Sequence, residues 1–592
     1  MASPCMPALR SQSFWIFCSA PEMTTVSKPK RKPASAEVRD QKKSRGFIFV
    51  GIRPSVPGGS RNGSGVPEIK QGIDAPCKSS FGVGERQGGC ASGQRGHGVL
   101  EEATRQVASI GLFKGMRILK RWTGLLMVAG LGGFMVGVDA GEAPRLKVDF
   151  SIRKGSVRPL HGVNGGPLCY RGMVDLRDYH RQLRLPSTRL HDVVWVNYDA
   201  VDISTIFHDF RDDAALAENY DFRATDDYLE AVKDVGSPVV YRLGESIEHT
   251  SRKYRVHPPT APQKWAEVCC RIIAHYNDGW AEGKRWGIQY WEIWNEPENR
   301  PAMWTGTPEE FFELYGVTAQ EIKRRWPDLK VGGPSIGDTG RFHDGVFEPG
   351  EFLMRFLDYC ADNTVPLDFF SWHRYSGEPW DYAKRARAIR GVLDARGFYR
   401  TESHCNEWNY LPREDWMPMM RDGQGEVREQ WAAEVQGIKG AAFAAWVLMS
   451  LQDAPVDMAN FYTAEVQMFG MFNMHGVPQK TYYAFKAFSE LLKTPSRVWA
   501  SECMRGEVAL CAGLSEDGAS GAVLLSSFKG EDEPVELELL GLPWRGEVGF
   551  QLELVDEGHN LTAVREGRVE AGGRVRLPEL QRPAVVLLRL TP

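Results

Sequence analysis

The stretch Tyr290–Arg300, with the sequence YWEIWNEPENR, decides the fold of this chain. Its first half is aromatic and apolar, which is typical of a strand buried on both faces of a parallel sheet. Its second half turns polar at Asn295 and Glu296 and continues into Pro297. In barrels of parallel strands, functional side chains gather at the carboxyl ends of the strands. The stretch therefore predicts a buried parallel strand that ends at a functional site.

Similar apolar segments recur along the chain and alternate with amphipathic helices. One helix, predicted over residues 307–325, begins with Thr307, Pro308 and Glu310, the pattern of a capping box with proline at the first helical position. Eight strands alternating with helices predict an α/β fold, a (β/α)8 TIM barrel over residues 141–493. A doubly wound open sheet is the alternative, but the glycine-rich phosphate turn of such sheets is missing after the first strand. The strands are predicted at residues 158–166, 185–192, 237–246, 288–297, 329–337, 367–375, 399–410 and 440–450.

The helical pattern stops after residue 493. Residues 494–592 contain short segments of period-2 alternation joined by turns of Gly, Asp and Glu. This pattern predicts an antiparallel β-sandwich as an accessory domain. Residues 145–155 alternate in the same way and could add a strand to that sandwich.

The N-terminal segment differs from the rest in composition. Residues 1–115 carry 17 Lys and Arg against 8 Asp and Glu, although the net charge of the whole chain is -4. Their Gly, Ser, Pro and Arg content predicts disorder, and we interpret them as an over-extended reading frame. Residues 116–140 have the basic start, uncharged run and small-residue end of a secretory signal peptide, with a transmembrane anchor as the alternative. The mature protein is expected to be secreted or periplasmic, without a stable membrane partner.

Two glutamates end apolar strands beside an amide and an aromatic residue, Glu296 in WNEP and Glu407 in CNEWN. Opposed carboxylates are what cleavage of a glycosidic bond requires, one to protonate the leaving oxygen and one to attack the sugar or activate water. An apolar wall is expected to raise the pKa of the acid. A strand-end Glu can instead be a helix N-cap or a solvated loop residue. Glu402, near the start of the same predicted strand as Glu407, competes with it less well for the nucleophile role.

Other polar residues end the remaining predicted strands, and they include Arg189, His191, Glu245, His373 and Tyr375. A buried histidine in such a position can also be a satisfied core residue. The chain has 11 cysteines, and those past Met116 follow no metal-ligand spacing, so we expect no metal and no cofactor. The chain past the leader is acidic and shows no basic stripe, which argues against nucleic acid as a partner.

The barrel segment resembles glycoside hydrolase family 39, the family of β-xylosidases and α-L-iduronidases, over residues 155–495. The family's strand-4 motif stands at Trp294–Pro297, and its strand-7 pattern of Glu, aromatic and Asn stands at Glu407–Asn409. The segments RLHD, GGPSIG and SWHRY resemble its motifs on strands 2, 5 and 6. The resemblance implies Glu296 as acid/base and Glu407 as nucleophile. It also implies double displacement with retention, with the two carboxyl groups about 5–5.5 Å apart.

The substrate implied by the resemblance is a saccharide with a neutral terminal sugar. The iduronidase branch carries a Lys soon after the strand-6 His, whereas Arg374 and Tyr375 follow His373 here. We therefore predict a β-xylosidase-like exo-glycosidase. The chain could assemble as a homo-oligomer. An endo-glycanase or arabinofuranosidase of the same clan, a non-catalytic carbohydrate-binding protein and an anchored envelope protein are the alternatives. Trp446, Trp304 and Trp380 are candidates for stacking on sugar rings. The residues expected to bind substrate or to orient the carboxylates are Asn295, His373, Tyr375, Arg189, His191 and Trp446.

Overall fold

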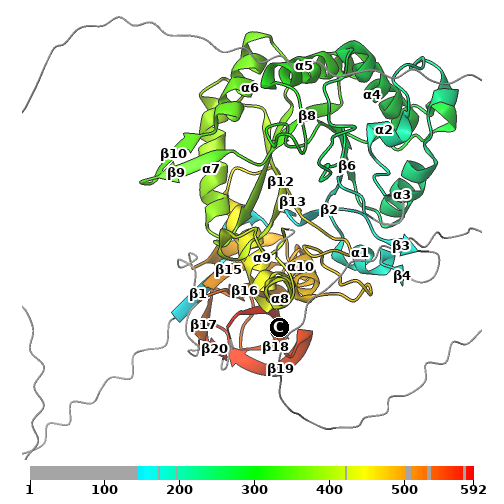
Figure 1. The fold of residues 1–592 in the computed structure, drawn as a ribbon. Helices are drawn as coiled ribbons and strands as arrows, with labels where there is room; N and C mark the ends of the chain where they lie inside the picture. The colour runs from blue at the N-terminus through cyan, green and yellow to red at the C-terminus, as the bar shows by residue number, and fades with distance from the viewer. Residues whose placement is uncertain are drawn as a thin grey trace, which may run out of the picture. The chain divides into compact units, whose positions relative to one another are not determined.

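Eight parallel strands close into a barrel in the order β11-β12-β13-β2-β5-β6-β7-β8. The computed structural model describes residues 145–170, 174–194, 198–420, 423–501, 508–529, 535–577 and 582–592. The predicted leader and signal peptide lie outside these residues. The (β/α)8 barrel that the sequence predicts is confirmed (Figure 1). Its strands are β2 (Gly162–Asn164), β5 (Thr188–Leu190), β6 (Val239–Leu243), β7 (Tyr290–Ile293), β8 (Lys330–Ile336), β11 (Phe369–Ser376), β12 (Glu402–Tyr410) and β13 (Met458–Phe461).

The eighth strand is not where the sequence predicted it. Residues 440–450 lie within helix α9 (Ile438–Ser450), and the barrel is closed by β13, which pairs with β12 and β2. The helix is apolar on nearly every side and almost all of its residues are buried. A run of this kind shows neither helical nor strand periodicity, so its pattern could not separate the two. Its alanine content, which favours helix, was the signal to weigh.

Helices surround the barrel and connect successive strands (Figure 1). The capping box predicted for α5 (Pro308–Arg325) is confirmed: Thr307 Oγ1 accepts from the Glu310 amide at 3.2 Å, and the Glu310 carboxylate accepts from the Thr307 amide at 2.7 Å. None of the described helices combines the length and apolar character needed to cross a membrane. The other helices are α1 (Arg177–Leu183), α2 (Ile203–Ile206), α3 (Arg223–Asp234), α4 (Pro262–Asn277), α6 (Glu351–Asp362), α7 (Asp381–Asp394), α8 (Glu426–Gln436) and α10 (Lys480–Leu491).

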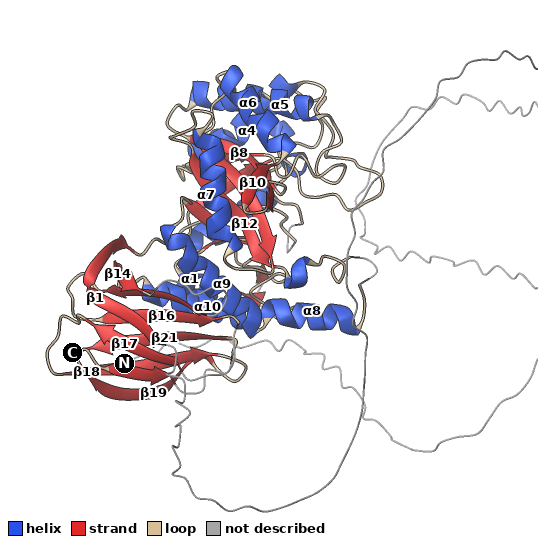
Figure 2. Ribbon diagram, turned by 90° about the vertical axis from the view of Figure 1, so that its left-hand side faces the viewer, coloured by secondary structure: helices blue, strands red, loops and turns tan. Residues whose placement is uncertain are grey.

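A second, mostly antiparallel sheet follows the barrel in sequence, with strand order β19-β18-β21-β16-β15-β14-β1-β17-β20 (Figure 2). Strand β1 (Arg145–Ser156) comes from before the barrel and pairs antiparallel with β14 and parallel with β17. All nine strands belong to one hydrogen-bonded sheet, so the two-layer sandwich stays a prediction. Its other strands are β14 (Ser496–Ala500), β15 (Val508–Leu514), β16 (Gly521–Ser527), β17 (Val535–Leu540), β18 (Glu547–Val555), β19 (Asn560–Glu570), β20 (Arg574–Leu577) and β21 (Ala584–Thr591).

The two faces of this sheet belong to different hydrophobic cores. Leu525 and Leu588 pack with other residues of the sheet, whereas Leu524 and Leu587 join the core of the barrel. Helices α9 and α10 lie against that second face, and Ser526 Oγ donates to the Ala442 carbonyl at 2.6 Å. Helix α9 is therefore covered by the barrel on one side and by the sheet on the other, which explains why it is apolar all round.

Candidate active site

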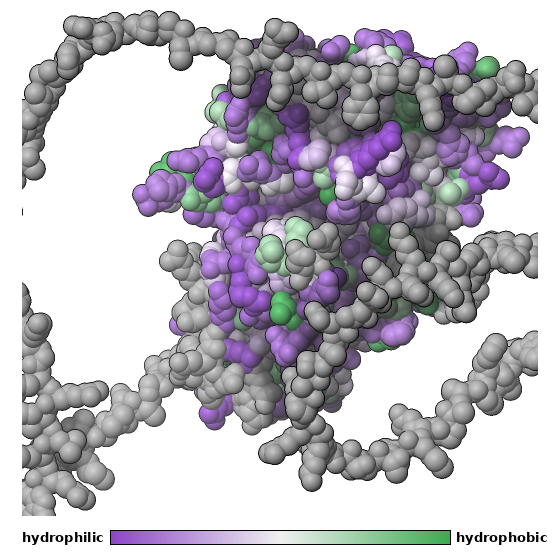
Figure 3. Space-filling view, in the orientation of Figure 1, coloured by the Kyte–Doolittle hydropathy of each residue, from purple (hydrophilic) through white to green (hydrophobic). Residues whose placement is uncertain are grey.

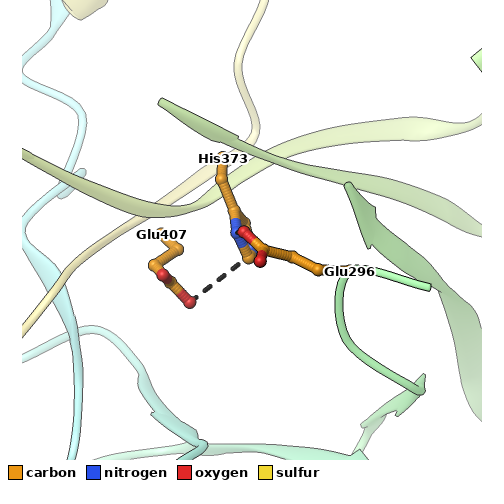
Figure 4. Close-up of side chains that lie close together, drawn as sticks. All are labelled: Glu296, His373 and Glu407. Carbon is orange, nitrogen blue, oxygen red and sulfur yellow. Dashed lines mark hydrogen bonds and ion pairs between the residues drawn. The ribbon is translucent and has the colours of Figure 1, made fainter. Parts of the chain in front are cut away.

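Three side chains meet at the carboxyl ends of the barrel strands (Figure 4). Glu296 follows β7, the fourth barrel strand, His373 lies on β11 and Glu407 on β12, the seventh. His373 contacts Glu296 Oε1 through Nδ1 at 2.7 Å, and its Nε2 lies 3.6 Å from Glu407 Oε2. One polar atom from each of the three residues lies within 4.8 Å of the others. The two glutamates that the sequence singled out are thus brought together around one imidazole.

Both oxygens of Glu407 have donors. Tyr375 donates its hydroxyl to Oε1 at 2.6 Å, and Arg189 donates Nη1 to Oε2 at 3.2 Å. Arg189 is fully buried on β5, and its Nη2 also donates to Asn295 Oδ1 at 2.6 Å. The Glu407 carboxylate is therefore oriented and compensated from two sides.

Beneath the site lies a polar layer that the sequence analysis missed. Glu292 on β7 is fully buried and accepts from Arg189 Nε at 2.6 Å and from Asn406 Nδ2 at 2.5 Å. Ser335 on β8 accepts from Arg189 Nη2 at 2.8 Å and lies 2.6 Å from His373 Nε2. The signal for Glu292 was a carboxylate inside an otherwise apolar strand. A buried charge of this kind needs a partner, and Arg189 supplies it.

The charges of Glu296 and His373 are coupled. Burial acts to raise the pKa of Glu296. The hydrogen bond from His373 and the positive charge of His373 lower it by more, so the pKa of Glu296 lies below its usual value. Burial acts to lower the pKa of His373, but the charges of Glu407 and Glu296 raise it above the usual value. The expected apolar wall around Glu296 is replaced by an imidazole that can hold a proton one hydrogen bond away. Both shifts favour an ion pair between the two residues.

The backbone at the site is held in sparsely populated conformations. Trp294, Glu296 and Ser335 have φ values of 70°, 41° and 61°, in the left-handed region that favours glycine. The Glu296 amide donates to the Ser335 carbonyl at 3.0 Å, which ties the turn after β7 to β8. Such conformations cost about 1–3 kcal/mol each and persist where the surroundings enforce them.

Three predicted residues form no hydrogen bond or ion pair with Glu296 or Glu407 in the described part of the chain. His191 is buried and contacts Asp192 at 3.2 Å, and burial together with the charge of Arg189 holds its pKa well below the usual value. Glu245 accepts from the amide and hydroxyl of Ser204, at 3.0 and 2.6 Å. Glu402 begins β12 at the opposite end of the barrel, where it contacts His404 at 2.9 Å.

The prediction that Trp446 stacks on sugar was wrong. Trp446 lies on α9, only 4% exposed, and packs against Trp380 with ring centres 6.3 Å apart. Because residues 440–450 form an outer helix, this side chain does not reach the strand ends. Trp304 is fully buried against Trp294. The aromatic residue that the analysis missed is Trp416, 38% exposed and edge-on to Tyr375 at 4.9 Å.

A cavity of about 520 Å³ opens beside Glu296. Its lining combines Glu296 with residues from the loops after β7 and β8 and from the N-terminal parts of α5 and α6. They are Glu298, Asn299, Pro308, Gly337, Asp338, Glu351, Phe352 and Arg355.

Glu296, His373 and Glu407 are also of the residue types that bind a divalent cation. Both ring nitrogens of His373 are within hydrogen-bond distance of protein atoms, Nδ1 of Glu296 and Nε2 of Ser335. The arrangement is accounted for by these contacts, and the expectation of no metal and no cofactor stays a prediction.

A parallel (β/α)8 barrel that carries two glutamates at the ends of its fourth and seventh strands defines a glycoside hydrolase. Residues 155–390 match the family described as glycosyl hydrolases family 39. A beta-xylosidase of Caldicellulosiruptor saccharolyticus is 26% identical over 394 residues, 59% of this chain and 72% of that protein. A beta-xylosidase of Geobacillus stearothermophilus is 25% identical over 315 residues, 49% of this chain and 57% of that protein.

Solved structures share the fold. A glucosidase from Croceicoccus marinus superposes with a TM-score of 0.63 at 24% identity, covering 76% of this chain and 99% of that one. A monomeric beta-xylosidase from Caulobacter crescentus CB15 gives a TM-score of 0.57 at 17% identity, covering 76% and 100%. The substrate of a glycoside hydrolase is a carbohydrate. The family match includes Glu296 and His373 but ends before Glu407, so geometry alone brings Glu407 into the site.

Proposed function

We propose that this glycoside hydrolase is a retaining, β-xylosidase-like exo-glycosidase that removes terminal neutral sugars from oligo- or polysaccharides. The observation that carries the proposal is the spacing of Glu296 and Glu407. A carboxylate oxygen of Glu296 lies within 4.8 Å of a carboxylate oxygen of Glu407. Retaining glycosidases hold their two carboxyl groups about 5–5.5 Å apart, and inverting ones about 6.5–9.5 Å apart. The short spacing favours direct attack by one carboxylate, because it leaves no room for a water between that carboxylate and the sugar.

Glu407 is the nucleophile in this proposal. The hydrogen bonds from Tyr375 and Arg189 hold its carboxylate in position for attack. One of its oxygens attacks the anomeric carbon as the bond from that carbon to the leaving oxygen breaks. The product of this step is a glycosyl-enzyme ester. The amide nitrogen of Asn295 donates a hydrogen bond to the 2-hydroxyl of the sugar, because the amide oxygen of Asn295 already accepts from Arg189.

Glu296 is the acid/base in this proposal, working as a pair with His373. The proton that the pair shares across 2.7 Å passes through Glu296 to the leaving oxygen. In the second step Glu296 takes a proton from water, whose oxygen attacks the anomeric carbon and releases Glu407. Neutralising Glu407 in the ester removes one of the charges that raise the pKa of His373, which prepares the pair for its second role.

The choice of a neutral β-xyloside rests on two observations. Both curated relatives reported above are named beta-xylosidases. Arg374, the one cation next to His373 in sequence, donates to Asp381 at 2.6 Å and to Glu414 at 2.9 Å. Its charge is therefore already paired, and it does not serve a uronate carboxylate.

The test is hydrolysis of aryl glycosides by the protein produced from Gly141, beside Glu296→Ala and Glu407→Ala. The panel holds β-xyloside, α-L-arabinoside, β-glucoside, β-galactoside and α-L-iduronide. We expect β-xyloside to be cleaved with β-xylose as the first product. Both variants should lose activity, and azide should restore each, giving α-xylosyl azide with Glu407→Ala and β-xylosyl azide with Glu296→Ala.

Glu402→Gln is the matched control, since it changes a glutamate on the same strand as Glu407 at the far end of the barrel. It should leave the activity on β-xyloside unchanged. Cleavage of another glycoside would correct the sugar, and an oligomer ladder from xylan would correct the exo mode. Saccharide binding without any turnover would refute the enzymatic proposal in favour of a binding protein.

We also propose export of the mature protein, because residues 116–140 have the pattern of a signal peptide. Expression from Met116 should yield secreted or periplasmic protein whose N-terminal sequence begins near Gly141. A membrane-retained protein that begins at Met116 would show an anchor instead.

A further inference from the structure

The cavity beside Glu296 lies on the side of the site where the catalytic acid acts. In the proposed reaction Glu296 protonates the leaving oxygen, so the group attached to that oxygen must lie next to Glu296. The cavity of about 520 Å³ is lined by Glu296 and is large enough for more than this one atom. The occupant of the cavity is therefore the leaving group rather than the sugar that becomes attached to Glu407.

The lining of this cavity is strongly acidic. Glu298, Asp338 and Glu351 join Glu296 on its wall, and the one basic residue among the lining residues is Arg355. Arg355 is itself bonded to Glu309, which is outside the lining, and lies 3.3 Å from Glu351. Its positive charge is thus shared with acidic partners, and the cavity keeps a negative excess.

Glu298 has one carboxyl oxygen that the described protein leaves unsatisfied. Its Oε1 accepts from the amides of Gly337 and Asp338, at 2.6 and 3.1 Å. Its Oε2 is buried and has no hydrogen-bond partner among the described residues. Burial and the nearby charge of Glu296 raise the pKa of Glu298 to about 7. A lone buried acceptor on the cavity wall points to a hydroxyl or ammonium donor on the group that enters.

We infer that this cavity is a leaving-group subsite that accepts neutral or cationic groups and rejects anionic ones, such as a uronate-bearing sugar. The inference rests on the proposed function, because it needs Glu296 to be the acid. Phe352 supplies the apolar wall of the subsite, and Asn299 is held in place by its hydrogen bond to Glu296 Oε2 at 3.0 Å. A donor on the leaving group matches Glu298 Oε2, the lining oxygen that has no partner among the described residues.

The test uses three aryl β-xylosides that differ only in the para group of the phenol: carboxylate, carboxamide and ammoniomethyl. The quantity measured is kcat/KM, which reports the step in which the leaving group departs. At low salt we expect kcat/KM for the carboxylate substrate to be about tenfold lower than for the carboxamide, because its charge repels the like charges of the lining a few ångströms away. The gap should narrow at high salt, because ions screen exposed charges beyond about 3 Å at 1 M.

Glu351→Gln and Asp338→Asn should each raise kcat/KM for the carboxylate substrate, relative to kcat/KM for the carboxamide, by about threefold. Comparing each variant with wild type cancels the difference in intrinsic reactivity of the phenols. Asp362→Asn is the matched control, since Asp362 ends the same helix that Glu351 begins, about 16 Å away along its axis. This control should leave the ratio unchanged.

The outcomes separate the two proposals. Cleavage of all three xylosides with the same relative rates in wild type and in both lining variants overturns the subsite while leaving the proposed function intact. Failure to cleave any β-xyloside overturns the proposed function, and the subsite with it. A preference for the carboxylate substrate would reverse the inferred selectivity and point to Arg355 as the controlling charge.

Discussion

At the scale of single residues, Arg189 determines how the charges of the site are balanced. It is fully buried, and its guanidinium donates to Glu292, Glu407 and Asn295 at once. Glu292 lies beneath it, away from the substrate side, and takes the closest ion pair at 2.6 Å. Glu407 shares the same cation at 3.2 Å and so keeps part of its charge available for attack. Glu292 is in this sense a positioning residue for the nucleophile.

We predict that Glu292→Gln lowers both activity and stability. With one carboxylate removed, Arg189 is compensated mainly by Glu407, which binds the nucleophile more tightly and should lower kcat/KM at least tenfold. Breaking a buried ion pair costs up to about 3–5 kcal/mol, although the Gln amide keeps part of the hydrogen bonding. The acid limb of the pH profile of kcat/KM should also shift to lower pH, because Glu292 no longer shares the positive charge of Arg189.

Steady-state kinetics across pH and thermal unfolding of the same variant measure these effects. Glu402→Gln, at the other end of the barrel, serves as the control for losing a partly buried glutamate. A purely structural role for Glu292 would lower the unfolding temperature without moving the pH profile.

Two buried histidines give the fold a pH dependence of its own. His161 and His180 are both at most 1% exposed, each with Nε2 near a backbone carbonyl, and burial lowers the pKa of each to about 4. In the unfolded chain a histidine has a pKa near 6.5, so below that pH the unfolded state binds more protons. Their contribution to stability is therefore present above about pH 6.5 and is lost as the pH falls towards 4.

We predict that His180→Gln weakens this acid destabilisation. Each such histidine makes the free energy of unfolding fall by about 1.4 kcal/mol per pH unit between pH 6.5 and 4. Glutamine can still donate to the Ala464 carbonyl but does not titrate. Denaturant unfolding at pH 7 and pH 5 should show a smaller loss for the variant than for wild type. Equal losses in the two proteins would place the titration elsewhere.

At the scale of elements, the sequence predicted the barrel because seven of its strands are apolar runs that end in polar residues. The same feature located Glu296 and Glu407, since strand ends and the active site coincide in this fold. It failed for β13, which has only four residues, Met458–Phe461, and no polar residue of catalytic type at its end. Helix α9 offered a longer apolar run nearby and was taken for the strand.

The polar layer under the site was beyond the reach of strand-end reasoning. Glu292, Ser335 and Asn406 lie within strands, and their side chains meet inside the barrel only because the strands close on one another. Their register depends on which strands are neighbours, which a single sequence does not state. Trp446 was misplaced for the related reason that its element was wrong. Contacts between strand ends, such as Tyr375 with Glu407, were predictable, and contacts between residues inside the strands were not.

At the scale of the whole described chain, the barrel and the second sheet are built from interleaved segments. Strand β1 precedes the barrel in sequence but lies between β14 and β17, whose sequence follows the barrel. In the sheet it is the link between β14 and β17, as the strand order shows (Figure 2). Figure 3 shows that the coloured surface of the face in view is mostly hydrophilic, with hydrophobic residues in small scattered groups. The apolar side chains of the sheet are buried in the two hydrophobic cores.

We predict that removing β1 destabilises the protein well beyond the loss of a terminal strand. Leu146, Val148 and Phe150 are all at most 4% exposed in the core of the sheet, and burying such a side chain contributes about 1.5–3 kcal/mol. Their sum is a large part of the 5–15 kcal/mol that stabilises a typical domain. A chain that begins at Val157 should unfold at a markedly lower temperature than one that begins at Gly141. It should also expose the edges of β14 and β17 and aggregate.

A synthetic peptide of residues 141–156 distinguishes this cause from damage to the barrel. Added to the shortened chain, it should raise the unfolding temperature progressively as its concentration increases, because it binds the folded state and not the unfolded one. A variant peptide with Val148→Asp should fail to do so, since it places a charge among the buried residues of the sheet. If the shortened chain unfolds at the same temperature as the longer one, β1 is dispensable. The packing of the hydrophobic core, rather than pairing with β1, would then hold the strands on the β14 side and on the β17 side of the sheet together.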